Sequence, residues 1–192
     1  DSTKAEDVAR LMDGAKASAV VTDVPYGISQ QSNGLRRLDY GEWDKDGADA
    51  TAFAAISLCG EIPSITAFCG DNQLSPLLCM MEGRTRRTLV WVKPNPTVLN
   101  GDYVFLPACE LAAHGRLSGA WFGGHCVRGV WDGTAPRDRD HPNQKPVGLI
   151  GWVIENTCPP DGVNYDPFVG SGTTIIAAEQ LGRKCYGMEI SP

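Results

Sequence analysis

The chain of 192 residues has no run of 18 consecutive apolar residues, which is about the length that a membrane-spanning helix needs. It also has no CxxC pair, and its seven cysteines are an odd number. A disulfide framework and a zinc knuckle both need closely spaced cysteines, so the sequence favours reduced thiols. His125 and Cys126 are neighbours, but no other ligand stands at a suitable spacing, so we expect no metal site.

Positive charge is in short supply. Lysine and arginine number 17 against 23 aspartates and glutamates, which gives a net charge of −6. That balance argues against a protein that coats nucleic acid non-specifically. The first seven residues are polar and mixed in charge, unlike a signal peptide, so we expect a cytoplasmic protein with no membrane partner. The apolar content of 42% is typical of a globular protein, and the length predicts a single domain over residues 1–192.

Short apolar segments alternate with segments of helical pattern along most of the chain. Strands are predicted at 19–22, 64–68, 88–93, 162–165 and 184–188, with one or two more within 103–113, and helices at 48–58, 73–81, 147–157 and 173–181. Thr3 and Glu6 predict a capping box for a further helix that ends at Gly14. Residues 24–47 are predicted to form a long loop, and residues 114–140 look mostly irregular. This order predicts an α/β fold with a mostly parallel, doubly wound Rossmann-like sheet and helices on both faces.

The segment from Asp166 to Thr174, DPFVGSGTT, follows a predicted strand and opens a predicted helix. Gly170 and Gly172 permit a tight turn and close approach of backbone to a ligand, while the helix start offers unpaired N–H groups. Glu189 stands at the end of the next strand, where an acidic residue typically binds the hydroxyls of a ribose. A glycine-rich turn alone is more often a simple chain reversal. Turn, helix and acidic strand end together predict a nucleoside-type cofactor.

A second segment, Asp23-Val24-Pro25-Tyr26-Gly27, also follows a predicted strand directly. A flat substrate could stack on Tyr26 while Asp23 accepts a hydrogen bond from an amino group. An ordinary turn, with the tyrosine covering the core, is the other interpretation of these residues.

A third segment, His141 to Pro146 (HPNQKP), precedes a predicted helix, and Pro146 suits its first position. Gln144 and Lys145 provide donors that could hold a carboxylate. The alternative is a solvated loop that caps the helix.

Taken in this order, the three segments resemble the beta-class, S-adenosylmethionine-dependent DNA amino-methyltransferases, in which the catalytic half precedes the cofactor half in a circularly permuted arrangement. The family pattern runs (D/N/S)PP(Y/F), a target-recognition segment, HPxQKP, DPFxGSGTT and GxE. Smaller similarities occur at Trp43-Asp44, Trp91 to Pro94 and Glu110. Val24 departs from the pattern because the family usually has proline there.

The resemblance implies residues for both parts of a site. Catalysis would involve Asp23, Val24, Pro25 and Tyr26. Cofactor binding would involve Asp166, Phe168, Gly170, Ser171, Gly172, Thr173 and Glu189, with Gln144 and Lys145 near the methionine end and Asp1 as the family's aspartate near adenine.

The implied reaction moves a methyl group from the sulfonium of S-adenosylmethionine to the exocyclic amine of a base flipped out of duplex DNA. Asp23 and the Val24 carbonyl would accept the amine hydrogens, and Tyr26 would stack on the base. Aspartate at position 23 inclines the family towards adenine N6, whereas serine inclines it towards cytosine N4. An enzyme acting on cytosine N4 or on RNA, and a cofactor- or DNA-binding module that no longer catalyses, remain alternatives.

DNA recognition has little room in this sequence, since residues 111–140 would form a short target-recognition segment. Arginines that could contact phosphates or bases are Arg36, Arg37, Arg116, Arg128, Arg137 and Arg139. For each of them a solvated loop charge is an equally good interpretation, and Arg84, Arg86 and Arg87 are expected on the surface. With so few contacts, a flanking domain or second subunit is expected to assist, and a role in restriction-modification fits the resemblance.

Overall fold

The structure is a computed structural model that describes residues 1–25, 48–94, 105–134 and 144–190, with the side chains of residues 48–50 left outside that description. The helices are α1 (Ala5–Met12), α2 (Ala48–Ser57), α3 (Asp71–Met80), α4 (Val147–Thr157) and α5 (Thr173–Gln180). The strands are β1 (Ala19–Asp23), β2 (Ser64–Cys69), β3 (Thr85–Val92), β4 (Cys109–Arg116), β5 (Val130–Asp132), β6 (Val163–Asp166) and β7 (Lys184–Gly187).

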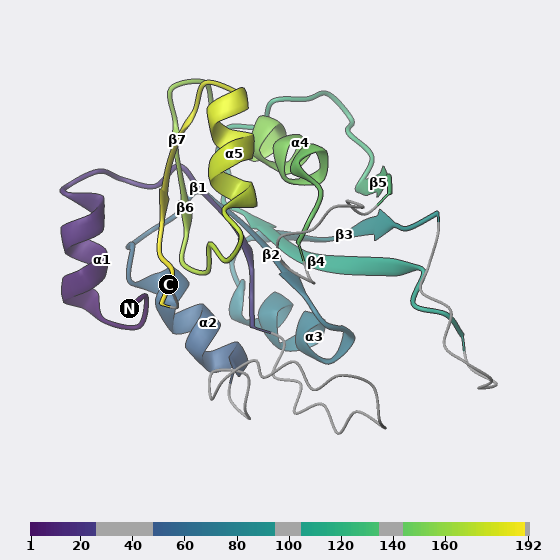
Figure 1. Ribbon diagram of the computed structural model, residues 1–192, viewed down its shortest axis with the longest axis horizontal. Helices are drawn as coiled ribbons and strands as arrows, with labels where there is room; N and C mark the ends of the chain where they lie inside the picture. The colour runs from purple at the N-terminus through teal and green to yellow at the C-terminus, as the bar shows by residue number, and fades with distance from the viewer. Residues whose placement is uncertain (26–47, 95–104, 135–143, 191–192) are drawn as a thin grey trace.

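The strands form one seven-stranded sheet in the order β5-β3-β4-β2-β1-β6-β7 (Figure 1). Four neighbouring pairs are parallel, and β4 runs antiparallel to both β2 and β3. The predicted α/β fold with a mostly parallel sheet is therefore confirmed. The strand order also reverses direction at β1, where the chain first goes to β2 and later returns to β6, and such a reversal is where open sheets bind ligands.

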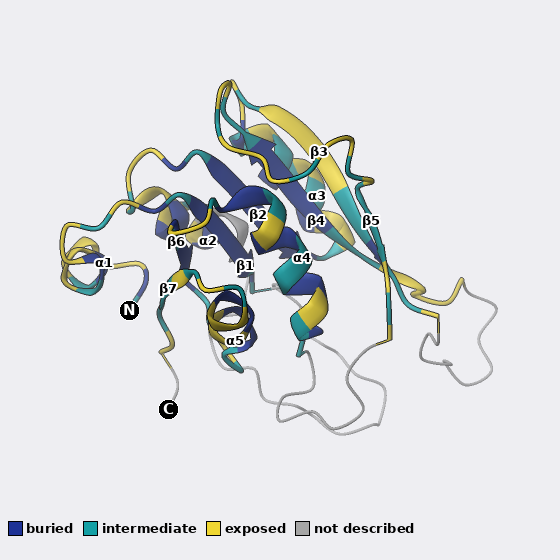
Figure 2. Cartoon of the chain, turned by 90° about the horizontal axis from the view of Figure 1, so that it is seen from above, coloured by how far each residue is buried: buried dark blue, intermediate teal, exposed yellow. Residues whose placement is uncertain are grey.

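Two apolar cores cover the two faces of the sheet. Side chains of α1, α2 and α3 contribute to one core, including Val8, Ile56 and Leu77. Side chains of α4 and α5 contribute to the other, including Ile154 and Ala178. The central strands are buried along their length, whereas the outer strand β3 is exposed at its start (Figure 2). Strands buried on both faces read as continuous apolar runs, which is why β1 and β2 were visible in the sequence.

Two local predictions were wrong. Lys4, not Thr3, is the N-cap of α1 and makes no side-chain cap, while the Thr3 hydroxyl donates to the Asp1 carboxylate at 2.7 Å. Pro146 is the N-cap of α4 rather than its first helical residue. Within 114–140, expected to be mostly irregular, the described residues 114–134 contain the end of β4 and all of β5. The strand predicted within 103–113 covers the start of β4. Its continuation to Arg116 was not predicted because a histidine and a glycine interrupt the apolar pattern (CELAAHGR), and burial between β2 and β3 overrides that weak propensity.

No helix in the described part of the chain has the length and apolar character that crossing a bilayer requires.

Candidate active site

The Asp23 segment and the glycine-rich segment lie at the same edge of the sheet. Strands β1 and β6 are parallel neighbours, so their carboxyl ends, at Asp23 and Asp166, emerge side by side. The hydroxyl of Thr22 donates a hydrogen bond of 2.6 Å to the carboxylate of Asp166. Segments that are 144 residues apart in the chain are thus joined directly.

The glycine-rich turn has the backbone conformation that its sequence predicts. Gly170 and Gly172 have φ angles of +51° and +77°, in the left-handed region that favours glycine. Gly172 is the N-cap of α5, and its N–H donates to the Val169 carbonyl at 3.0 Å. Behind this turn, the first N–H groups of α5 begin without intrahelical acceptors, which gives the turn a positive potential.

The end of β7 closes the turn from the outer side. Val169 N–H donates to the Met188 carbonyl, and Met188 N–H donates to the Asp166 carbonyl, each at 3.0 Å. A Cβ on Gly187 would lie 2.0 Å from a methyl group of the Val169 side chain, so any larger residue would force Val169 to shift. The exposed carboxylate of Glu189 then accepts the N–H of Gly170 at 2.8 Å. The glycine in the GxE pattern is therefore explained by packing, and it delivers Glu189 to the turn.

Asp166 is buried beneath this turn, with 1% of its surface exposed. Burial raises its pKa to about 6, against the opposing effect of hydrogen bonds from Thr22, Thr174 and the Phe168 N–H. The Phe168 N–H lies 3.0 Å from the carboxylate. Asp166 therefore acts on the shape of the turn, because it fixes the backbone on one side and β1 on the other.

The segment after β1 is held at three points. Val24 N–H continues the strand ladder by donating to the Phe68 carbonyl at 3.1 Å, and the Val24 side chain is buried. The Pro25 carbonyl accepts a hydrogen bond of 2.7 Å from the side-chain amide of Gln73, which is itself 4% exposed. Valine in place of the family's proline thus loses a rigid ring but gains a donor that proline lacks. Gln73, in the first turn of α3, was missed in the sequence because a polar helix residue carries no pattern of its own.

The third contact that holds the segment after β1 is made by the buried ammonium of Lys145. Lys145, with a side chain 5% exposed, lies 2.5 Å from the carboxylate of Asp23 and 3.1 Å from that of Glu110. Burial lowers the pKa of Lys145, but the two carboxylates outweigh burial and leave it raised. The carboxylate of Glu110 also pairs with Lys93, and these ammonium groups hold the Glu110 pKa below its usual value in spite of burial.

The structure describes only some of the other site residues that the sequence predicted. Tyr26 and His141 lie outside the described residues, as do Trp43 and Asp44. The Ser171 and Thr173 hydroxyls lie 3.0 Å apart at the start of α5. The Asp1 carboxylate accepts the Thr3 N–H at 3.0 Å in a local turn before α1. Lys145 lies against Asp23, and its expected position near the methionine end of a cofactor stays a prediction, as do the binding roles of Gln144 and Asp1.

The arginines that the structure describes lie mainly at the opposite edge of the sheet. Arg116 ends β4, donates to the Ala120 carbonyl at 2.7 Å and stacks over Phe122. Arg84 donates to the Ile62 carbonyl at 2.7 Å, while Arg86 and Arg87 are exposed as expected. Arg116 pairs with Ser64 at the start of β2, whereas Asp23 pairs with Phe68 near the end of β2, so Arg116 and Asp23 lie at opposite ends of the strands. The candidates Arg36, Arg37, Arg137 and Arg139 lie outside the described residues.

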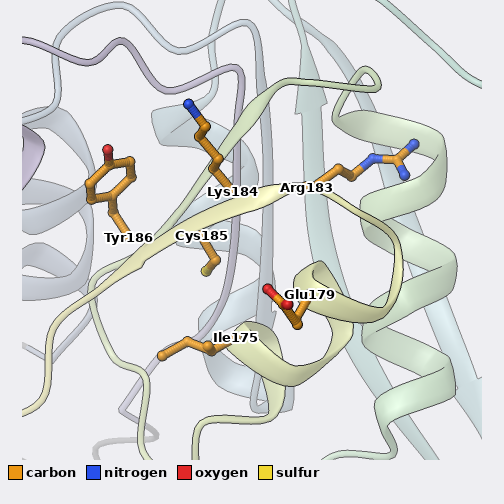
Figure 3. Close-up of a pocket in the computed structure, with 6 residues that line it drawn as sticks. All are labelled: Ile175, Glu179, Arg183, Lys184, Cys185 and Tyr186. Atoms are coloured by element: carbon orange, nitrogen blue, oxygen red, sulfur yellow. The ribbon is translucent and has the colours of Figure 1, made fainter.

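A separate hollow lies between α5 and the start of β7 (Figure 3). Its lining residues are Ile175, Glu179, Arg183, Lys184, Cys185 and Tyr186. Lys184 pairs with Val163 at the start of β6, whereas the glycine-rich turn follows the end of β6, so this hollow is distinct from the turn. Over the same described residues, no three histidine, cysteine or acidic side chains gather as metal ligands, and the seven cysteines are free thiols.

Known proteins are similar to the C-terminal part of this chain in sequence and to nearly the whole chain in fold. Residues 120–192 match a family model described as DNA methylase. The type II methyltransferase M2.LlaDCHI of Lactococcus lactis subsp. cremoris is 27% identical over 123 residues, which are 62% of this chain and 42% of that protein. The chain spans less than half the length of the curated relatives it matches.

Two solved structures resemble the fold over nearly the whole chain. The complex of M1.HpyAVI with SAM has a TM-score of 0.72 at 23% identity and covers 98% of this chain and 91% of that one. The cytosine-N4-specific PvuII DNA methyltransferase has a TM-score of 0.67 at 16% identity and covers 92% of this chain and 76% of that one. Residues 120–192 are therefore similar in sequence to the DNA methylase family, and nearly the whole chain shares the fold of these solved methyltransferases.

Proposed function

We propose that the protein transfers a methyl group from S-adenosylmethionine to the exocyclic amino group of a base in DNA, with adenine N6 as the acceptor. The observation that carries the proposal is the joining of the two loops: Thr22 bonds Asp166 beneath the glycine-rich turn and immediately precedes Asp23. A donor bound on the turn and an amine held at Asp23 would therefore meet at one sheet edge, and such positioning lowers the barrier of a two-substrate reaction.

The residues around the turn fit S-adenosylmethionine. Gly170 and Gly172 leave the turn without side chains, and the nearest atom to a Cβ on Gly170 would be 4.0 Å away, so a ligand can approach the backbone. Glu189 offers a carboxylate for ribose hydroxyls, and Ile190, which is 47% exposed, offers an apolar surface beside it for a flat ring. When bound, the cofactor supplies an electrophilic methyl group on a sulfonium.

The chain's own residues would activate the acceptor. An exocyclic amine is a poor nucleophile because its lone pair is delocalised into the ring. Asp23 and the Val24 carbonyl would accept its two hydrogens, which localises the lone pair on nitrogen. The amine must lose one proton when its new bond to carbon forms, and the Asp23 carboxylate is the acceptor at hand.

The acceptor base separates this proposal from its alternatives. Intact protein with labelled S-adenosylmethionine should be incubated with duplex DNA and, separately, with structured RNA, and the digested nucleosides analysed by mass. N6-methyladenine from DNA is the expected product. N4-methylcytosine would correct the base and keep the reaction, a methylated nucleoside from RNA alone would replace the substrate, and cofactor binding without any product would indicate a module that no longer catalyses.

The relatives motivate the wider setting of the proposal. M2.LlaDCHI is named as a type II methyltransferase, and a site-specific modification enzyme of a restriction-modification system is the corresponding role for this protein. Such an enzyme would flip the base out of the duplex, and with a net charge of −6 it would hold DNA through local contacts, assisted by a flanking domain or second subunit.

A further inference from the structure

Four alternating charges run along the edge of the sheet to the catalytic carboxylate. Lys93 follows β3, Glu110 opens β4, Lys145 precedes α4, and Asp23 ends β1. Lys93 pairs with one oxygen of Glu110, and Lys145 lies 3.1 Å from the other oxygen and 2.5 Å from Asp23. Among the residues that the structure describes, the two ammonium groups and two carboxylates of this cluster sum to zero charge.

The cluster is enclosed enough for its charge balance to matter. Lys145 is 5% exposed and its ammonium lies 5.9 Å from the centre of the Phe68 ring. Glu110 and Lys93 have side chains 26% and 23% exposed, and the Lys93 ammonium lies 4.8 Å from the Trp91 ring. In such surroundings an unbalanced charge is screened weakly and acts on its nearest partner.

We propose that Glu110 is a positioning residue for the methyl transfer, acting on Asp23 through Lys145. The inference rests on the proposed function. Glu110 forms ion pairs with both Lys145 and Lys93, and it is the carboxylate that the described residues place against Lys93. Without it, these four described side chains would carry one more positive charge, which would draw the Asp23 carboxylate more strongly onto Lys145. A carboxylate held in this way would accept the amine hydrogen more weakly.

The test uses three variants of the intact protein. Two are the single variants Glu110→Gln and Glu110→Asp, and the third is a double variant that carries both Lys93→Gln and Glu110→Gln. Single-turnover methyl transfer to duplex DNA gives the rate constant, and calorimetry with S-adenosylmethionine gives its Kd. Glu110→Gln should slow transfer by about tenfold or more and change Kd by less than about threefold. The double variant restores zero charge and should recover most of the lost rate, while Glu110→Asp should stay within about threefold of the natural protein.

A purely structural role would give a different pattern. It would make the double variant, which has lost two contacts, at least as slow as Glu110→Gln. Glu155→Gln, an exposed glutamate on α4, is the matched control and should leave the rate unchanged. Should Glu110→Gln fail to fold, the comparison of Glu110→Asp with the double variant decides, since both are expected to be active.

Each outcome bears on one proposal or on both. A transfer rate for Glu110→Gln within twofold of the natural protein overturns this inference alone. A double variant no faster than the single variant does the same. Natural protein that binds the cofactor yet methylates nothing overturns the proposed function, and this inference with it.

Discussion

The hydroxyl of Thr22 and the carboxylate of Asp166 are joined by a 2.6 Å hydrogen bond beneath the edge where β1 and β6 end. Thr22 precedes Asp23, and Asp166 opens the glycine-rich turn, so one buried contact fixes two loops relative to each other. A sub-ångström displacement here would change the distance between a bound donor and an acceptor. The contact therefore links the packing of the sheet to the proposed chemistry.

Asp23→Ala should abolish methyl transfer, by at least about a hundredfold, and leave cofactor binding nearly intact. The fold should survive because Lys145 keeps Glu110 as a partner 3.1 Å away. A labelled-transfer assay and a cofactor titration measure the two effects separately, with Glu155→Ala as a control at an exposed position. Equal loss of transfer and binding would remove Asp23 from the catalytic role.

Asp166→Asn should change how stability depends on pH. The pKa of Asp166 is raised in the folded chain to about 6, so the folded state binds the proton more tightly than the unfolded state does. Its contribution to the free energy of unfolding is fully present below about pH 4 and is lost as the pH rises through about 6. The stability of the natural protein relative to Asp166→Asn should fall across this window by at most about 3 kcal/mol.

Urea unfolding at pH 4, 5, 6 and 7 measures that difference. Asp161→Asn is the control, because Asp161 is exposed and has a φ of +62°, which asparagine tolerates. A difference that stays level, or that grows with pH, would show that Asp166 is not held protonated by burial.

Gly187→Ala should distort the turn rather than the sheet. The new Cβ would lie 2.0 Å from a methyl group of Val169, so we expect Val169 and the turn to move away from β7 and the hydrogen bond from Gly170 N–H to Glu189 to weaken. We expect a loss of about 1–3 kcal/mol in unfolding free energy together with weaker cofactor binding. Gly151→Ala on α4 is the control, since its Cβ would make an ordinary contact 3.8 Å from Leu181. An unchanged cofactor affinity in Gly187→Ala would show that Gly187 is not needed to shape the cofactor-binding turn.

Gln73→Leu should loosen the catalytic segment. The Pro25 carbonyl would lose its 2.7 Å hydrogen bond, and the Gly70 N–H would lose its side-chain acceptor at 3.1 Å. We expect a loss of about 1–3 kcal/mol in stability and a transfer rate lowered by about tenfold. Gln180→Leu, at an exposed position of α5, should alter neither quantity. A normal rate in Gln73→Leu would show that the segment is held well enough by Val24 and Lys145.

The sequence predicted those parts of the molecule whose causes are local. The apolar run of β1, the helix at 147–157 and the turn at Gly170 each follow from residues within a few positions. It missed the end of β4 and all of β5, which are strands because of their neighbours in the sheet. It gave Glu110 only as a minor similarity and gave no sign of Gln73, because each works through a residue far away in the chain. Two partners of Lys145, Glu110 and Asp23, lie 35 and 122 residues away, and no spacing pattern encodes such pairs.

The central claim is that this protein methylates a base amine in DNA through Asp23. The most direct measurement is modified-base sequencing of DNA from cells that express the intact protein, beside cells that express Asp23→Ala. We expect N6-methyladenine at one recurring sequence with the natural protein and none with the variant. DNA free of modified bases in both cultures, or equally modified in both, would contradict the account.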